Sequence, residues 1–158
     1  MIAAIFGEFK PLRRFGLPIY VVLSVALLAV RVFVAIPYWN SGWTKWASFP
    51  TQINSSAKYL FSQEYKLHIL GTAYNMPFPE LLAYFAALGE VILPVLLVIG
   101  LFSRFAGLGL LGMTMVIQLV YPGAWALHAQ WALAALTIVV CGPGIFSLDA
   151  GIRKLIKA

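Results

Sequence analysis

Charged residues are scarce in this sequence. Asp, Glu, Lys and Arg make up only 10% of its 158 residues, whereas 62% are apolar. A soluble domain carries about 25% charged residues, so the composition excludes a chain with water as its main solvent. The apolar residues gather in long blocks separated by short polar stretches, which leaves no room for a second, soluble domain. We therefore expect a single membrane domain over residues 1–158.

Cysteine and histidine are also rare, and this excludes several kinds of redox and metal site. Cys141 is the single cysteine, which excludes an internal disulfide and an internal dithiol redox pair. Of the two histidines, only His128 lies near an expected span, so paired histidine ligands for a haem are not expected. The sequence has no Cys/His cluster for a metal and no glycine loop for a nucleotide. We expect no haem, metal or nucleotide, and any electrons have to pass through a bound organic cofactor or a partner.

Four apolar blocks approach the ~20 residues that cross ~30 Å of hydrocarbon as a helix. They cover residues 17–39, 80–100, 104–121 and 127–146. The membrane interior offers no water to unpaired backbone groups, which excludes a β architecture for these blocks. The predicted fold is all-α, an integral membrane four-helix bundle with a long extracytoplasmic loop, residues 40–79, between the first and second spans. We call this loop the cap.

Basic residues predict the orientation of the bundle. They are concentrated at the N-terminus, in the second connection and at the C-terminus, namely Lys10, Arg13, Arg14, Arg104, Arg153, Lys154 and Lys157. The cap carries only Lys45, Lys58 and Lys66. The positive-inside rule then places both termini in the cytoplasm. Because the basic residues stand at the ends of apolar runs, the net charge of +6 indicates topology and no nucleic-acid partner.

The cap is rich in aromatic residues at its start. Tyr38, Trp39, Trp43, Trp46 and Phe49 are typical of an aromatic belt at the membrane surface. Further along, residues 57–65 place apolar side chains on one helical face and polar ones on the other. This pattern predicts a short helix on the membrane surface.

Arg31 and Glu90 are the informative pair of charged residues deep inside expected spans, where a charge requires a partner or water. At 1.5 Å per residue they lie about 12 and 15 Å below the outer surface, so an intramembrane salt bridge is predicted. A pair that only fixes helix register and a working site remain equal alternatives. Pro94 favours a site, because it lacks the amide hydrogen that would bond the carbonyl of Glu90.

Other polar and aromatic residues fall at the same end of the spans. They are Gln118, His128 and Gln130, with Trp43, Lys45, Tyr84 and Trp131 as candidate walls. Together they predict a pocket that opens towards the extracytoplasmic leaflet and suits a quinone headgroup. In it, Glu90 exchanges a proton, Arg31 is its electrostatic partner and His128 assists.

At the opposite end, Arg104 and Asp149 are expected near one another. They are predicted either to form a surface ion pair or, for Asp149, to cap the basic C-terminal tail against anionic lipid.

The sequence resembles the DoxX family of small four-span membrane proteins between about Val30 and Asp149. Three separate pieces carry the resemblance. They are Arg31 with NSGWTK at 40–45, Gly89-Glu90 with GLFSR at 100–104, and GPGIFSLD at 142–149. Within the third piece, Ile145 stands where the family frequently has a basic residue.

The resemblance implies a redox-associated protein of a bacterial-type inner membrane. Family members are linked to a thiosulfate:quinone oxidoreductase subunit and to membrane complexes that handle oxidative or thiol stress. The leading hypothesis is thus a quinone-interacting subunit of an oxidoreductase system, with membrane lipid and a periplasmic or membrane redox partner around it. The alternative is a non-catalytic scaffold whose cap recruits a periplasmic partner. A small-solute carrier is a third hypothesis, weakened by the lack of an evident repeat.

Overall fold

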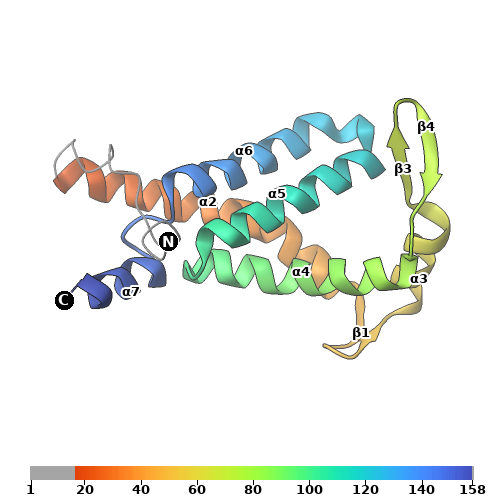
Figure 1. Cartoon of the computed structure of the whole chain (residues 1–158), viewed down its shortest axis with the longest axis horizontal. Helices are drawn as coiled ribbons and strands as arrows, with labels where there is room; N and C mark the ends of the chain where they lie inside the picture. The colour runs from red at the N-terminus through yellow and green to blue at the C-terminus, as the bar shows by residue number, and fades with distance from the viewer. Residues whose placement is uncertain (1–16, 158) are drawn as a thin grey trace.

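The computed structural model describes residues 17–157 and consists mainly of four long helices (Figure 1). These helices are α2 (Leu17–Trp43), α4 (Pro79–Ile99), α5 (Ser103–Val120) and α6 (Trp125–Cys141). In the described part of the chain, four helices are long and apolar enough to cross a membrane. The predicted all-α membrane bundle is confirmed.

Proline and glycine set the boundaries of these helices. Pro79 occupies the first turn of α4, where a missing amide hydrogen breaks no helical hydrogen bond. Gly100 ends the same helix with φ of 75°, and a Cβ there would clash with Ser147 and Arg31. Only glycine therefore fits the tight turn between α4 and α5.

The four helices pack in antiparallel pairs around an apolar core. Helix α2 packs mainly on α4, and α5 packs mainly on α6. The buried core includes Leu27, Val34, Leu97, Leu110 and Ile138. Apolar side chains also cover the outside of the bundle, among them Val22, Phe85, Leu108, Met115 and Leu133. An apolar outer surface on four spanning helices is a surface for lipid.

The predicted cap contains the expected short helix together with two hairpins that the sequence did not predict. Helix α3 (Ser55–Tyr59) continues into a π-helical turn (Leu60–Glu64). Strands β1 (Trp46–Ser48) and β2 (Gln52–Ile53) form one antiparallel hairpin, and β3 (Lys66–Ile69) and β4 (Thr72–Asn75) form the other. The exclusion of β structure applied to spanning segments only. In the cap, short strands satisfy their backbone groups by pairing outside the spans.

A second apolar cluster fixes the cap to the bundle. Ile53, Ala57, Phe61 and Met76 from the cap pack with Ala83 and Ala87 of α4. The ring nitrogen Nδ1 of His68 in β3 also lies 3.1 Å from the carbonyl oxygen of Leu119 in α5. The cap is therefore attached to both α4 and α5, and it covers one end of the bundle (Figure 1).

The opposite end of the bundle is held together by Asp149, in the first turn of α7 (Leu148–Lys157). Asp149 is 1% exposed. Its carboxylate accepts hydrogen bonds from the backbone amides of Phe102 and Ser103 at 2.8 and 2.9 Å and from the Ser103 hydroxyl at 2.7 Å. The carboxylate thus caps the N-terminus of α5, where the helix dipole favours a negative charge.

This arrangement corrects both predictions for Asp149. Its carboxylate is buried against the start of α5, where its hydrogen-bond partners are Phe102 and Ser103 in place of the expected Arg104. Arg104 donates to the carbonyl of Val140 at 3.4 Å. Helix α7 is capped instead by Ser147, whose hydroxyl oxygen accepts from the amide of Ala150 at 3.2 Å. The sequence could not reveal that Asp149 belongs to a neighbouring helix.

Lys10, Arg13 and Arg14, on which part of the orientation argument depended, lie outside the described residues. The cytoplasmic placement of both termini stays a prediction.

The capping role of Asp149 can be tested by Asp149→Asn. We expect this variant to lower the free energy of unfolding by about 1–3 kcal/mol, because it weakens hydrogen bonds that satisfy buried amides. Thermal unfolding in detergent measures the loss, with Glu64→Gln on the exposed surface of the cap as the control. Equal melting temperatures for the two variants would contradict the role.

Candidate functional site

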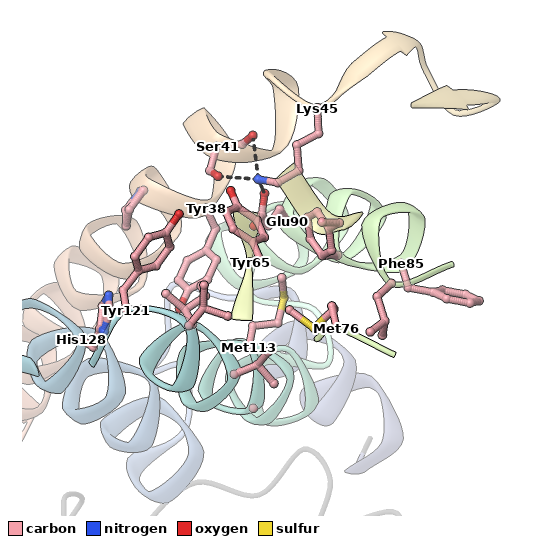
Figure 2. Close-up of a pocket in the computed structure, with 18 of the residues that line it drawn as sticks. Tyr38, Ser41, Lys45, Tyr65, Met76, Phe85, Glu90, Met113, Tyr121 and His128 are labelled. Atoms are coloured by element: carbon pink, nitrogen blue, oxygen red, sulfur yellow. Dashed lines mark hydrogen bonds and ion pairs between the residues drawn. The ribbon is translucent and has the colours of Figure 1, made fainter. Parts of the chain in front are cut away.

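A cavity of about 510 Å³ lies between the helices beneath the cap. Its walls are mostly apolar, and the polar or aromatic side chains that line it come from α2, the cap, α4, the end of α5 and α6. They are Tyr38, Ser41, Lys45, Phe61, Tyr65, Phe85, Glu90, Tyr121, His128 and Trp131. Figure 2 shows ten of the lining residues with labels.

The strongest polar feature of the cavity is an ion pair between Lys45 and Glu90. Both side chains are nearly buried, with 11% and 7% of their surfaces exposed. The ammonium group of Lys45 also donates to the hydroxyl oxygen of Ser41 at 2.7 Å (Figure 2). A buried carboxylate and a buried ammonium each need such partners, because isolated charges are very unfavourable away from water.

Gly42 makes this ion pair possible. A Cβ at Gly42 would lie 3.0 Å from the backbone carbonyl carbon, the carbonyl oxygen and the Cβ of Glu90. The absence of a side chain therefore lets α2 contact α4 directly at the level of the carboxylate. Helix α2 ends at Trp43, so the chain can turn and direct the Lys45 side chain back to Glu90.

Tyr38 adds a hydroxyl group to the cavity wall. It is 2% exposed and lies 2.6 Å from the hydroxyl oxygen of Thr114. The carbonyl of Leu110 lies 2.7 Å from the Thr114 hydroxyl and 3.4 Å from the Tyr38 hydroxyl, so each hydroxyl has both the other hydroxyl and this carbonyl as acceptors. The phenolic oxygen of Tyr38 therefore keeps lone pairs that can accept a hydrogen bond.

A chain of hydrogen bonds fixes the orientation of His128. The amide nitrogen of Gln118 donates to the carbonyl of Pro122 at 3.0 Å, which leaves its Oε1 to accept from Nδ1 of His128 at 2.7 Å. In the neutral ring, Nε2 is then an acceptor. Trp131 packs beside the imidazole with 5.4 Å between ring centroids, and it also contacts Tyr38.

The cap contributes Tyr65 to the site. Burial, reinforced by its neighbour Tyr121, raises the pKa of the Tyr65 hydroxyl above its ordinary value. This phenol stays protonated at neutral pH and can donate a hydrogen bond. The two rings meet edge to face at 5.8 Å, where the cap adjoins the end of α5.

The predicted salt bridge between Arg31 and Glu90 is wrong. Arg31 is fully buried, and its guanidinium donates to the carbonyls of Leu97 and Val98 at 3.3 and 3.1 Å and to the carbonyl of Phe146. Positions 90 and 97 differ by about 10 Å along a helix. Arg31 therefore lies towards the α7 end of the bundle, whereas Glu90 lies towards the cap.

The error came from placing the outer ends of the first and second spans at one level. Helix α2 continues to Trp43, four residues past the expected end, and Gly42 near that end lies against Glu90. Arg31 stands eleven residues before Gly42, which is about 16 Å along the helix and beyond the reach of Glu90. Hydropathy does not reveal how two helices are shifted along one another, so only the packed structure locates the partners.

The remaining candidate residues divide into two groups. Lys45, Glu90, His128 and Trp131 line the cavity together, as expected. Trp43, Tyr84, Gln118 and Gln130 do not line it. Trp43 packs against Trp39 and Phe49, and Tyr84 packs against Trp46 and Phe85. Gln118 acts on the cavity through His128, and Gln130 is exposed.

Sequence reasoning missed several lining residues. The sequence places Tyr38 in the surface aromatic belt, Ser41 in the NSGWTK piece of the family resemblance and Tyr65 on the predicted surface helix. It assigns no role to Tyr121. A signal was available for Ser41, because it stands four residues before Lys45 near a helix end. For Tyr65 and Tyr121 no local pattern exists, since the fold of the cap brings them together.

A family comparison agrees with this architecture. The DoxX family model matches residues 26–129, which is more than half of the chain. The chain belongs to the DoxX family. The match includes Lys45, Glu90 and His128, and it ends before the GPGIFSLD piece at 142–149. No curated protein and no solved structure matches the chain significantly.

Membership of the DoxX family and the four spanning helices define a multi-pass membrane protein whose apolar outer surface contacts lipid.

A double-mutant cycle distinguishes the observed ion pair from the predicted one. We expect Lys45→Met and Glu90→Gln to be coupled by about 0.5–3 kcal/mol in free energy of unfolding, because each single change leaves the other group without its partner. Arg31→Met and Glu90→Gln are expected to be additive within about 0.5 kcal/mol, as for distant sites. Thermal unfolding of all variants in one detergent provides the values. Additive effects for Lys45 and Glu90 would rule out the pair.

Proposed function

We propose that this DoxX protein binds a quinone headgroup in the cavity and serves as the membrane subunit of an oxidoreductase system. The observation that carries the proposal is a largely apolar cavity with a buried Lys45–Glu90 ion pair in its wall. A quinone ring has two apolar faces and two carbonyl oxygens that need donors. Mostly apolar walls with a few placed polar groups are typical of sites for such molecules.

The lining residues offer suitable partners for both redox states of a quinone. The ammonium of Lys45 donates to Glu90 and to the hydroxyl and carbonyl oxygens of Ser41, and a quinone carbonyl oxygen can replace the Ser41 carbonyl at 3.3 Å, which is the longest of these contacts. The hydroxyl of Tyr65 is a second donor for a carbonyl oxygen. The Nε2 of neutral His128 is an acceptor for a hydroquinone hydroxyl. Figure 2 shows Lys45 and His128 on opposite sides of the labelled lining residues. The two carbonyl oxygens of a quinone also lie on opposite sides of its ring.

In the proposed reaction, the quinone takes up two electrons and two protons, so that both C=O bonds become C–OH groups. The electrons come from a redox partner protein that lies in the membrane or docks on the cap. Glu90 acts as the proton donor or acceptor beside Lys45, and His128 assists at the second oxygen. Positioned groups of this kind assist proton transfer within hydrogen-bond reach.

The proposed setting is a bacterial-type inner membrane with both termini in the cytoplasm and the cap outside. Arg104 in the first turn of α5 and the basic residues of α7 support this orientation.

A scaffold that recruits a periplasmic partner is the second candidate, and exposed apolar residues of the cap favour it. Leu70 at the tip of the β3–β4 hairpin is fully exposed, and Tyr59, Tyr74 and Phe78 are each more than half exposed. Exposed apolar residues in one region are typical of interaction surfaces.

Quinone binding is tested with the purified protein in nanodiscs. A quinone analogue that reaches the cavity, which Trp131 lines, is expected to quench part of the fluorescence of the five tryptophans with a saturable dependence on concentration. We expect Glu90→Gln to weaken this binding about tenfold, because it removes one charge of the pair and leaves Lys45 without its partner, a loss of about 1–3 kcal/mol.

The matched control is Glu80→Gln on the same helix, since the side chain of Glu80 is 76% exposed. All variants are first checked for unchanged melting behaviour and size. Quenching that does not saturate, or that is equal in Glu90→Gln and Glu80→Gln, would contradict the quinone site and favour the scaffold.

A further inference from the structure

The helices α4 and α5 are in close contact near α7 and separate towards the cap (Figure 1). A Cβ at Gly109 would lie 2.7 Å from Cδ1 of Leu93, so the two helices touch there. Three residues further along α5, a Cβ at Gly112 would meet nothing within 4 Å. The space beside Gly112 is therefore open, and Gly112 lines the cavity.

The exposure of the lining residues shows where the cavity opens. At the seam between α4 and α5, Phe85 is 58% exposed and Val116 is 49% exposed, and Gly112 is also exposed. On the far wall, Tyr38 and His128 are 2% and 3% exposed. Three of the four exposed lining residues lie at this seam, and the fourth, Tyr121, is 50% exposed where α5 ends beside the cap. The main opening is thus lateral, between α4 and α5. We call Phe85, Gly112 and Val116 the portal.

The cap covers the cavity from above. Phe61 and Met76 line the cavity and are each only 8% exposed. Both belong to the apolar cluster that fixes the cap to α4. The contact between the rings of Tyr65 and Tyr121 adjoins them at the end of α5. A molecule that approached from the aqueous side would have to displace these packed side chains.

The portal lies within the lipid-facing part of the bundle. Gly112 stands eight residues before the end of α5 at Val120, which is about 12 Å along the helix. Exposed side chains of the same two helices include the apolar residues Leu81, Leu108 and Met115. A molecule that enters here comes from the hydrocarbon region, so it must itself dissolve in lipid.

The charge of the site restricts the head of that molecule. Lys45 is already neutralised by Glu90, so the pair adds no net charge to the cavity. An anionic phosphate in the same buried space could not pair with Lys45, because Lys45 already pairs with Glu90. Burial of an unpaired charge is unfavourable. The pair favours an uncharged polar head.

From these observations we propose that the portal is the entry route and tail subsite for an uncharged, lipid-soluble ligand. The polar head occupies the cavity near Lys45 and Glu90, and a single long apolar tail passes over Gly112 between Phe85 and Val116 into the membrane. This inference rests on the proposed quinone function and specifies which quinones the site takes, namely those with a long apolar tail.

The test compares a tail-less quinone with its long-tailed homologue in nanodiscs, with concentrations expressed per lipid. Gly112→Phe fills the portal with a side chain. We expect it to weaken binding of the long-tailed quinone at least tenfold and to change binding of the tail-less quinone less than twofold. Tryptophan quenching measures both affinities.

Two control variants separate the portal from general effects on the helix. Met115→Phe adds a ring to an exposed position of α5 that does not line the cavity, and it should change neither affinity. Gly112→Ala places a small group where the structure has space, so both quinones should bind it as they bind the wild type.

The outcomes distinguish the two proposals. If the wild type binds neither quinone, the proposed function is wrong and the portal loses its ligand. If the wild type binds both but Gly112→Phe weakens neither, or weakens both equally, the quinone site stands and the tail route is overturned. Selective loss of the long-tailed quinone in Gly112→Phe alone supports the portal.

Discussion

The burial of Lys45 and Glu90 is the constraint on which the cap half of this protein depends. Neither charge is stable in an apolar interior without the other. Their contact requires α2 to lie directly against α4, which Gly42 permits. It also requires the chain to leave the helix after Trp43 and turn back over the bundle. The cap begins at this turn, so the same interaction sets the position of the cavity roof.

The two ends of the bundle differ in how closely their helices pack. Near α7, Arg31 and Asp149 satisfy backbone groups at helix ends and turns, and these contacts join α2, α4, α5 and α7. They leave little space, as the clash expected for any side chain at Gly100 indicates. Near the cap, α4 and α5 separate and the ion pair faces a cavity. The bundle is therefore closely packed at the α7 end and hollow at the cap end, where the proposed ligand binds.

This division gives the proposed quinone site a physical basis beyond family membership. The family by itself identifies a membrane protein, because one fold supports many functions. The cavity adds specific chemistry: apolar walls, donors on the cap and α2 sides, and an acceptor on α6. In both proposed functions a partner protein docks on the exposed apolar residues of the cap. In the quinone function, this partner supplies the electrons.

The sequence alone determined the four spans and the all-α bundle, because length and hydropathy decide whether a segment can remain in hydrocarbon. It also identified Glu90, Lys45, His128 and Trp131 as residues that line one cavity, since polar or amphipathic residues in or beside a span are rare. Only the tertiary structure decided which residues are partners. Whether Glu90 meets Arg31 or Lys45 depends on how far α2 and α4 are shifted along one another and how they are rotated, and hydropathy carries no information on either.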